Sequence, residues 1–221
     1  TNEVWFAPTG TSSFSAGATM TQAASGTATS IAAPATEGTY YIYVLDAAGN
    51  ISTKSTATLT VDDTAPTAAI TYNSAAPYTN SDTVTITATF NEAMADSPVV
   101  KIGITGVETL AATAMTKVST TVYTYSYDVP AGNGTQTVAL SVGTDVAGNT
   151  ITAAPTSGAT FTIDNTAPTN QNDVFPSSVT QQGGSSVTIV SSGTATNEVW
   201  FAPAGTSSFS AGATMTQAAS G

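Results

Sequence analysis

The chain has 221 residues, of which 14 are acidic and 3 are basic, so it carries a net charge of −11 and repels nucleic acids and anionic lipid surfaces. It contains neither cysteine nor histidine, which excludes disulfide bonds, thiolate nucleophiles and the usual ligands of transition metals. No apolar run approaches the roughly 20 residues of a transmembrane helix, so we expect no insertion into a membrane.

A long repeat joins the first and last parts of the sequence. Residues 1–26 recur as residues 196–221 with one difference, Thr9 against Ala204, so the repeat length is 196 − 1 = 195 residues. Near-identity over this length predicts an array in which a pair of unlike domains is repeated. We therefore expect the chain to begin inside one module and to end inside another.

Two short motifs predict the module boundaries. Residues 46–50 read Asp-Ala-Ala-Gly-Asn and residues 145–149 read Asp-Val-Ala-Gly-Asn, and a Gly-Asn pair supplies the positive φ angles of a tight turn. Each turn is followed by an alternating strand and a Thr-Ala-Pro linker, where proline cannot donate to a sheet. The linkers start 166 − 64 = 102 residues apart, which is an ordinary module length. We expect the later part of a module at 1–63, a complete module at 64–163 and the beginning of the next at 164–221.

Strands dominate the prediction in all three parts. Threonine alternates with apolar residues, and this period of two is typical of strands with one buried face. We expect a fully buried central strand at 40–45 and another strand at 186–190. In the complete module we expect strands at 68–72, 83–90, 99–104, 110–117, 121–129, 135–142 and 159–163. Short strands, polar turns and no amphipathic helix predict an all-β chain of Greek-key β-sandwiches.

The motifs, taken as a set, resemble a known family. A Thr-Ala-Pro opening, a second strand ending in Phe-Asn-Glu-Ala-Met at 90–94 and a closing Asp-Val-Ala-Gly-Asn at 145–149 are similar to the bacterial immunoglobulin-like tandem repeats of large secreted adhesins and surface filament proteins. The resemblance covers nearly the whole chain. It implies tandem immunoglobulin-like Greek-key β-sandwiches in an extracellular stalk or filament at the bacterial cell surface, often stiffened by calcium at domain junctions. It implies no particular receptor.

In such a sandwich the incoming linker, the turn after the second strand and the turn before the last strand meet at one pole. This arrangement gathers oxygen ligands from loops that are far apart in the sequence, namely Asp62, Asp63, Asn91, Glu92, Asp145 and Asn149. Calcium takes about six to eight oxygen ligands, including carbonyls and water. We therefore expect a Ca²⁺ ion at this junction, where it would fix the angle between modules.

Two further groups hold part of the same pattern. One group lacks the linker residues and consists of Glu3, Asp46 and Asn50. The other lacks the residues of the closing turn and consists of Asp164, Asn165 and Glu198. Aspartate and asparagine are also ordinary turn formers that bond their own backbone, and this simpler interpretation applies to each residue taken alone. The recurrence of the pattern and the negative charge of the chain favour a metal for the set.

The sequence favours a structural role over catalysis, because a nucleophile and a base would have to be built from carboxylates that lie in turns. We expect a spacer or filament whose partners are neighbouring modules of the array or copies of itself, with a host or surface receptor as a further candidate. One alternative is a self-assembling fibre or sheath, in which incomplete modules are completed by strands from the next subunit. Another is a carbohydrate-binding module that stacks sugars on Trp5 and Trp200.

Overall fold

The structure, a computed structural model, describes residues 2–14, 20–23, 30–167, 177–183, 185–189, 198–202, 204 and 215–217. Across these residues the strands pair in antiparallel sheets and no helix is present, so the prediction of an all-β chain is confirmed. The chain divides into two compact units, Thr1–Asn165 and Thr166–Gly221. Each unit is described by itself below.

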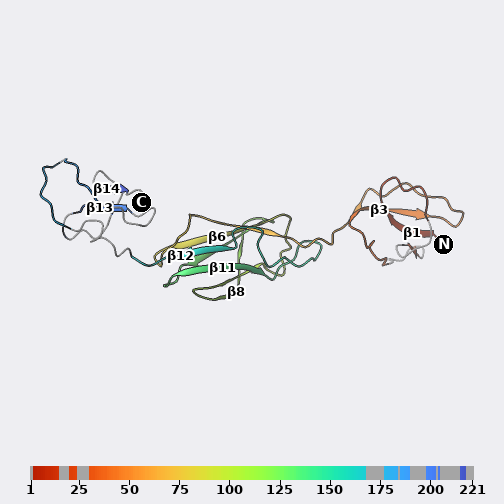
Figure 1. Cartoon of the computed structure of the whole chain (residues 1–221). Helices are drawn as coiled ribbons and strands as arrows, with labels where there is room; N and C mark the ends of the chain where they lie inside the picture. The colour runs from red at the N-terminus through yellow and green to blue at the C-terminus, as the bar shows by residue number, and fades with distance from the viewer. Residues whose placement is uncertain are drawn as a thin grey trace. The chain divides into compact units, whose positions relative to one another are not determined.

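Two four-stranded sheets form the later part of the first unit (Figure 1). One has the order β5-β6-β10-β9, with the bounds β5 Ala68–Tyr72, β6 Thr83–Phe90, β10 Val122–Asp128 and β9 Thr116–Lys117. The other has the order β12-β11-β7-β8, with the bounds β12 Thr160–Ile163, β11 Gly134–Ser141, β7 Lys101–Thr105 and β8 Leu110–Ala114. Most predicted ranges agree, but the single strand predicted at 110–117 is wrong. The chain leaves one sheet and enters the other at the buried Met115.

One apolar core fills the space between these two sheets. On β6 the alternate residues Val84, Ile86 and Ala88 are fully buried, and on β7 Ile102 and Ile104 are too. Side chains from both sheets belong to the same buried cluster, because strands with a period of two present one face to each other and the other to solvent. The region 64–163 is therefore a β-sandwich.

A polar contact also joins the two sheets inside this core. Gln136 on β11 is fully buried, and its Nε2 donates a hydrogen bond of 2.8 Å to the hydroxyl oxygen of Tyr127 on β10. Gly106, with φ +142°, leaves the space that this contact needs. A Cβ there would lie 2.2 Å from the carbonyl oxygen of Thr135 and 2.5 Å from Oε1 of Gln136. Backbone and side chains are thus closely fitted at this end of β11.

A third four-stranded sheet occupies the earlier part of the unit, in the order β2-β1-β3-β4. Its bounds are β1 Asn2–Ala7, β2 Met20–Ala23, β3 Gly38–Leu45 and β4 Thr58–Val61. One face carries a small aromatic cluster, in which the ring of Phe14 lies 5.2 Å from that of Trp5 and 5.3 Å from that of Tyr43. Trp5 and Tyr43 are buried by these contacts.

The prediction of a fully buried strand at 40–45 is wrong. Ile42 is 38% exposed, and its neighbour Val44 is only half-buried. Both residues lie on the face opposite Tyr43, because side chains alternate along a strand. The sequence is apolar on both faces of β3. The Tyr43 face is covered, whereas on the other face Tyr40 is buried, Val44 is half-buried and Ile42 is exposed. The apolar sequence of β3 thus indicates that the strand can be buried, but it does not identify the segments that cover each face.

The second unit contains the hairpin of β13 (Glu198–Trp200) and β14 (Met215–Gln217). Its register pairs Val199 with Thr216, and in the first unit Val4 pairs with Thr21, so the register is conserved across the 195-residue repeat. The strand predicted at 186–190 is not formed over 185–189, while Val190 lies outside the described residues. The repeated sequence therefore gives the same local hairpin twice.

We expect Ile104→Ala to lower the free energy of unfolding by about 2–5 kcal/mol, because it removes a fully buried side chain from the core and leaves a cavity. Val118, which is 64% exposed, offers the matched control, and Val118→Ala should change it by less than about 0.5 kcal/mol. Urea unfolding followed by tyrosine and tryptophan fluorescence measures both. Equal effects of the two substitutions would contradict the core as described.

Candidate metal centre

A tight turn between β11 and β12 fixes the carboxylate of Asp145. The residue is 2% exposed, and its Oδ1 accepts hydrogen bonds from the backbone N–H groups of Gly148 at 2.6 Å and Asn149 at 2.8 Å. Its Oδ2 accepts a third from Nδ2 of Asn149 at 2.8 Å. Burial opposes ionisation of Asp145, but these bonds and one from the N–H of Ala147 outweigh it and hold its pKa below the ordinary value. The turn therefore presents an ionised carboxylate in one orientation.

The same turn occurs at its first copy in the sequence. Oδ1 of Asp46 accepts from the N–H of Asn50 at 2.8 Å, and Oδ2 accepts from Nδ2 of Asn50 at 2.8 Å. These hydrogen bonds from Asn50 lower the pKa of Asp46. The Asp-x-Ala-Gly-Asn motif thus builds its own geometry from contacts within five residues, and it does so in both copies.

The linker after β4 is held against the Asp145 turn. Nδ2 of Asn149 donates a second hydrogen bond, of 2.8 Å, to the backbone oxygen of Asp62. Within the linker, Oδ1 of Asp62 accepts from the N–H of Thr64 at 3.0 Å, as in an Asx turn. A single asparagine amide therefore joins the linker to the carboxylate of Asp145.

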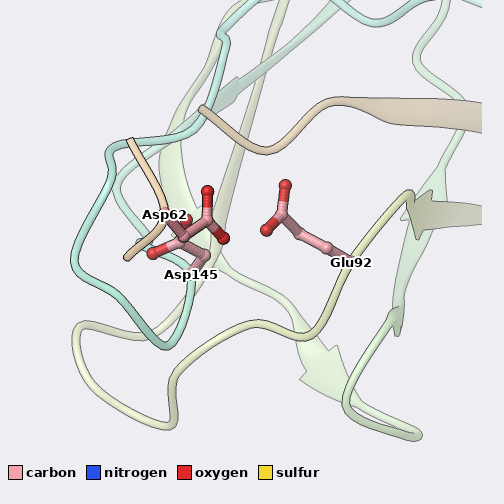
Figure 2. A group of neighbouring side chains, drawn as sticks. All are labelled: Asp62, Glu92 and Asp145. Carbon is pink, nitrogen blue, oxygen red and sulfur yellow. The ribbon is translucent and has the colours of Figure 1, made fainter. Parts of the chain in front are cut away.

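Glu92 brings a third carboxylate to the same place, from the loop that follows β6. One carboxylate oxygen from each of Asp62, Glu92 and Asp145 lies within 4.8 Å of the others. Figure 2 shows the side chain of Glu92 extending toward the two aspartates. Linker, loop and turn are distant in sequence, and the fold brings one acidic side chain from each of them together.

The three carboxylates raise the electrostatic energy of this cluster. Burial, together with the negative charges of Asp62 and Asp145, raises the pKa of Glu92 above its ordinary value. Among the residues that the structure describes, Lys117 and Asp96 form an ion pair, which includes none of the three carboxylates of the cluster. The cluster therefore concentrates negative charge that no ion pair within the described residues neutralises.

The donor set fits a calcium ion. Calcium binds oxygen at about 2.3–2.6 Å, so two oxygens that share one ion lie no more than about 5 Å apart, and the 4.8 Å limit of this cluster satisfies that condition. All three side chains are carboxylates, the hard oxygen donors that calcium prefers over nitrogen or sulfur. Asp145 is already held by its turn, so the ion would meet at least one ligand in a fixed position.

The other residues predicted for this site have different contacts. Asn91 uses its Oδ1 to accept from the N–H of Thr67 at 2.7 Å, which ties the start of the sandwich to the loop after β6. Asp63 is exposed, and its N–H donates to Oε1 of Glu37 at 3.1 Å. Nδ2 of Asn91 also donates to Oε1 of Glu92 at 3.3 Å, so Asn91 contacts the cluster through its amide nitrogen, as Asn149 does. Asp63 is not part of the group of carboxylates within 4.8 Å.

Glu37 is a contact of the linker that the motifs did not reveal. Its Oε1 accepts from the hydroxyl of Thr64 at 2.5 Å as well as from the N–H of Asp63. The hydrogen bond from the Thr64 hydroxyl has the larger effect and that from the N–H of Asp63 the smaller, and both lower the pKa of Glu37 below its ordinary value. A signal existed in the pairing of β3 with β4, because Gly38 lies opposite Val61 and so places Glu37 beside the linker. Predicting it needed the strand register as well as the motif.

The residues of the two partial groups make the following contacts among the described residues. Nδ2 of Asn165 donates to the carbonyl oxygen of Gly132 at 2.5 Å, and its Oδ1 accepts from the N–H of Asn80 at 2.7 Å, so its amide caps the far end of the sandwich. Asp164 donates its N–H to the carbonyl oxygen of Tyr78. Glu3 lies on β1 opposite Leu45. The side chain of Glu198 lies outside the described ones.

Of the two tryptophans predicted as a sugar-binding platform, the structure describes the side chain of Trp5 alone. Trp5 is 7% exposed and packs edge-on against Phe14, so it offers no open ring face. Trp200 lies on β13, and its side chain is outside the described ones. Burial of Trp5 weighs against sugar stacking at that position.

Comparison of the chain with protein-family models, with curated proteins and with solved structures finds no match. The residues that the structure describes contain no helix long and apolar enough to cross a bilayer. The family resemblance therefore depends on the sequence motifs alone.

Asp145 and Asp46 form a matched pair for testing how the turn supports the fold. We expect Asp145→Ala to lower the free energy of unfolding by about 1–3 kcal/mol, because it removes the buried acceptor of two partly buried N–H donors. Asp46→Ala should cost less, since the donors around Asp46 are exposed to water. Urea unfolding in chelator measures both variants. A larger loss for Asp46→Ala would contradict the burial difference.

Proposed function

We propose that this chain is a structural repeat of an extracellular bacterial stalk or surface filament, built from tandem immunoglobulin-like β-sandwiches and stiffened by calcium at the junction before residue 64. The observation that carries this proposal is the meeting of Asp62, Glu92 and Asp145, because one of these residues belongs to the linker and the other two to the sandwich. The motif set that resembles bacterial immunoglobulin-like repeats supports the same function.

Calcium would act on the linker, because Asp62 directly follows β4 of the preceding sheet. Without an ion, the linker is held to the sandwich by the amide of Asn149, while the charges of Glu92 and Asp145 oppose the approach of Asp62. With calcium bound, that repulsion becomes attraction to a shared cation. Extracellular modules of this type bind calcium at about 0.1–1 mM, and a hundredfold excess over the dissociation constant adds about 2.7 kcal/mol.

The low content of charged groups supports a passive mechanical role. With 8% charged residues and no histidine or cysteine, the chain has few groups suited to proton transfer or nucleophilic attack. Its polar surface consists largely of threonine, serine and asparagine on strands and turns. A module of this composition is suited to holding a distance between other parts of a protein.

We expect calcium to bind this chain saturably and to raise its melting temperature relative to chelator, with both effects lost in Asp145→Ala. Isothermal titration calorimetry and thermal melts in calcium and in chelator measure them. Asp46→Ala is the matched control, because it removes the same carboxylate from the copy of the turn that lacks Glu92, and it should keep the calcium response. Absence of heat and of any shift in melting temperature would refute the calcium site.

Glu92→Gln separates a metal centre from an ordinary set of turns. In chelator we expect this variant to be more stable than the parent chain, because it removes a like charge from beside Asp62 and Asp145. In calcium we expect the order to reverse, because the amide is a poorer ligand than the carboxylate. Thermal melts in both conditions measure the two differences. A turn residue with no role in metal binding would give the same order of stability in chelator and in calcium.

A further inference from the structure

The peptide bond between Asp62 and Asp63 is hydrogen-bonded on both of its sides. Its carbonyl oxygen accepts from Nδ2 of Asn149 at 2.8 Å, and its N–H donates to Oε1 of Glu37 at 3.1 Å. The bond is trans, so its C=O and N–H point in opposite directions. Asn149 belongs to the turn between β11 and β12 of the sandwich, whereas Glu37 directly precedes β3 of the earlier sheet. One peptide group is therefore bonded to both parts of the chain that the linker joins.

Glu37 also reaches the carboxylate of Asp62, through Thr64. The hydroxyl of Thr64 donates to Oε1 of Glu37 at 2.5 Å, and the N–H of Thr64 donates to Oδ1 of Asp62 at 3.0 Å. Thr64 thus connects the carboxylate of Glu37 with that of Asp62, which belongs to the acidic cluster, while Glu37 itself is not a member of that cluster. Glu37 can therefore influence the direction of Asp62 without being a ligand.

The contact between Glu37 and the linker recurs at the end of the sandwich. In both places a glycine that begins one strand pairs with the last residue of the strand before the linker. Asn133 directly precedes β11 as Glu37 precedes β3, and its Oδ1 accepts from the N–H of Asn165 at 2.6 Å. Asn165 is the second residue of its linker, as Asp63 is of the first. An oxygen acceptor at one register position therefore holds the linker in both copies, although the residue that supplies it differs.

These contacts act on geometry more than on stability. Glu37 is exposed, as are its hydrogen bonds to Asp63 and Thr64, and water competes for bonds of this kind. Their effect is to fix two consecutive linker residues on a single oxygen atom, which restricts rotation of the backbone between them. A ligand that is already oriented binds an ion without the entropic cost of ordering it. The contacts are thus suited to setting the direction of the linker.

We propose that the peptide group of Asp62 and Asp63 is a bridge between consecutive modules that holds without calcium, and that Glu37 is a positioning residue that directs Asp62 into the acidic cluster. The two sides of the bridge are coupled, because release of the N–H from Glu37 lets the peptide plane rotate and so weakens the bond from Asn149. The bridge itself is independent of any ion. The positioning role rests on the proposed calcium site and deepens it.

The decisive experiment compares Glu37→Ala with Glu37→Gln by NMR hydrogen exchange of the full chain in chelator. Both variants lose the same charge, but glutamine keeps an oxygen acceptor, of the kind that Asn133 supplies in the second copy. We expect the N–H of Asp63 and the side-chain amide of Asn149 to exchange about threefold or more faster in Glu37→Ala than in Glu37→Gln, because hydrogen bonds protect amides from exchange. The side-chain amide of Asn165, which is bonded elsewhere, is the internal control and should exchange equally in both.

Calorimetric titration of the same two variants tests the positioning role. We expect the calcium dissociation constant to be about three- to tenfold higher for Glu37→Ala than for Glu37→Gln, because the alanine variant must order Asp62 when the ion binds. Melting temperatures in chelator should agree, which shows that both variants fold.

Each outcome decides one part of the proposal. Equal exchange at Asp63 and Asn149 in the two variants would overturn the bridge, whether or not calcium binds. Equal dissociation constants would overturn the positioning role. A parent chain that binds no calcium but shows the expected difference in exchange would refute the metal site, and with it the positioning role, while supporting the bridge. Failure of the bridge and failure of the calcium site are therefore distinguishable.

Discussion

Covering the apolar face of a sheet is the constraint on which this chain depends. A strand with a period of two exposes half of its side chains on each face, and a sheet of such strands is stable when another layer excludes water from the apolar side. In the sandwich this condition is met by two sheets that bury Ile86 and Ile104 in one core. In the sheet β2-β1-β3-β4 it is met on the Trp5 face and only in part on the other. Much of the difference between the two regions follows from this.

The same constraint explains which parts of the fold could be predicted. Alternation of apolar and polar residues is a local signal, and it placed strands such as β5 and β6 at their observed bounds. Whether a strand is buried depends on distant partners, and for this reason the exposure of Ile42 was not foreseen. The crossing at Met115 was missed for a similar reason, because apolar residues continue through it while the hydrogen-bonding partner changes.

The candidate site shows how far motifs can go. Asp145 and Asn149 could be recognised because their turn is built from its own backbone, and Asp62 and Glu92 because they flank boundaries of strands. The passage of the linker at this pole predicts both Asp62 and Asp63 as ligands, yet neighbours in an extended segment point in opposite directions, and Asp63 is exposed. Glu37 escaped notice because its approach to Thr64 follows from the register of β3 with β4. Side-chain direction and strand register were the information that motifs lacked.

The repeated hairpin register of β1–β2 and β13–β14 bears on how such an array folds. Hairpin contacts are local, so each copy can form early, whereas the pairing of β7 with β11 must wait for a long loop to close. Two nearly identical hairpins on one polypeptide can also exchange partners during synthesis, which is a known hazard of repeat proteins. The intervening residues, whose sequence differs from that of the hairpins, separate the two copies in time and along the chain. Alternation of unlike domains would thus protect the order of folding as well as set the length of the array.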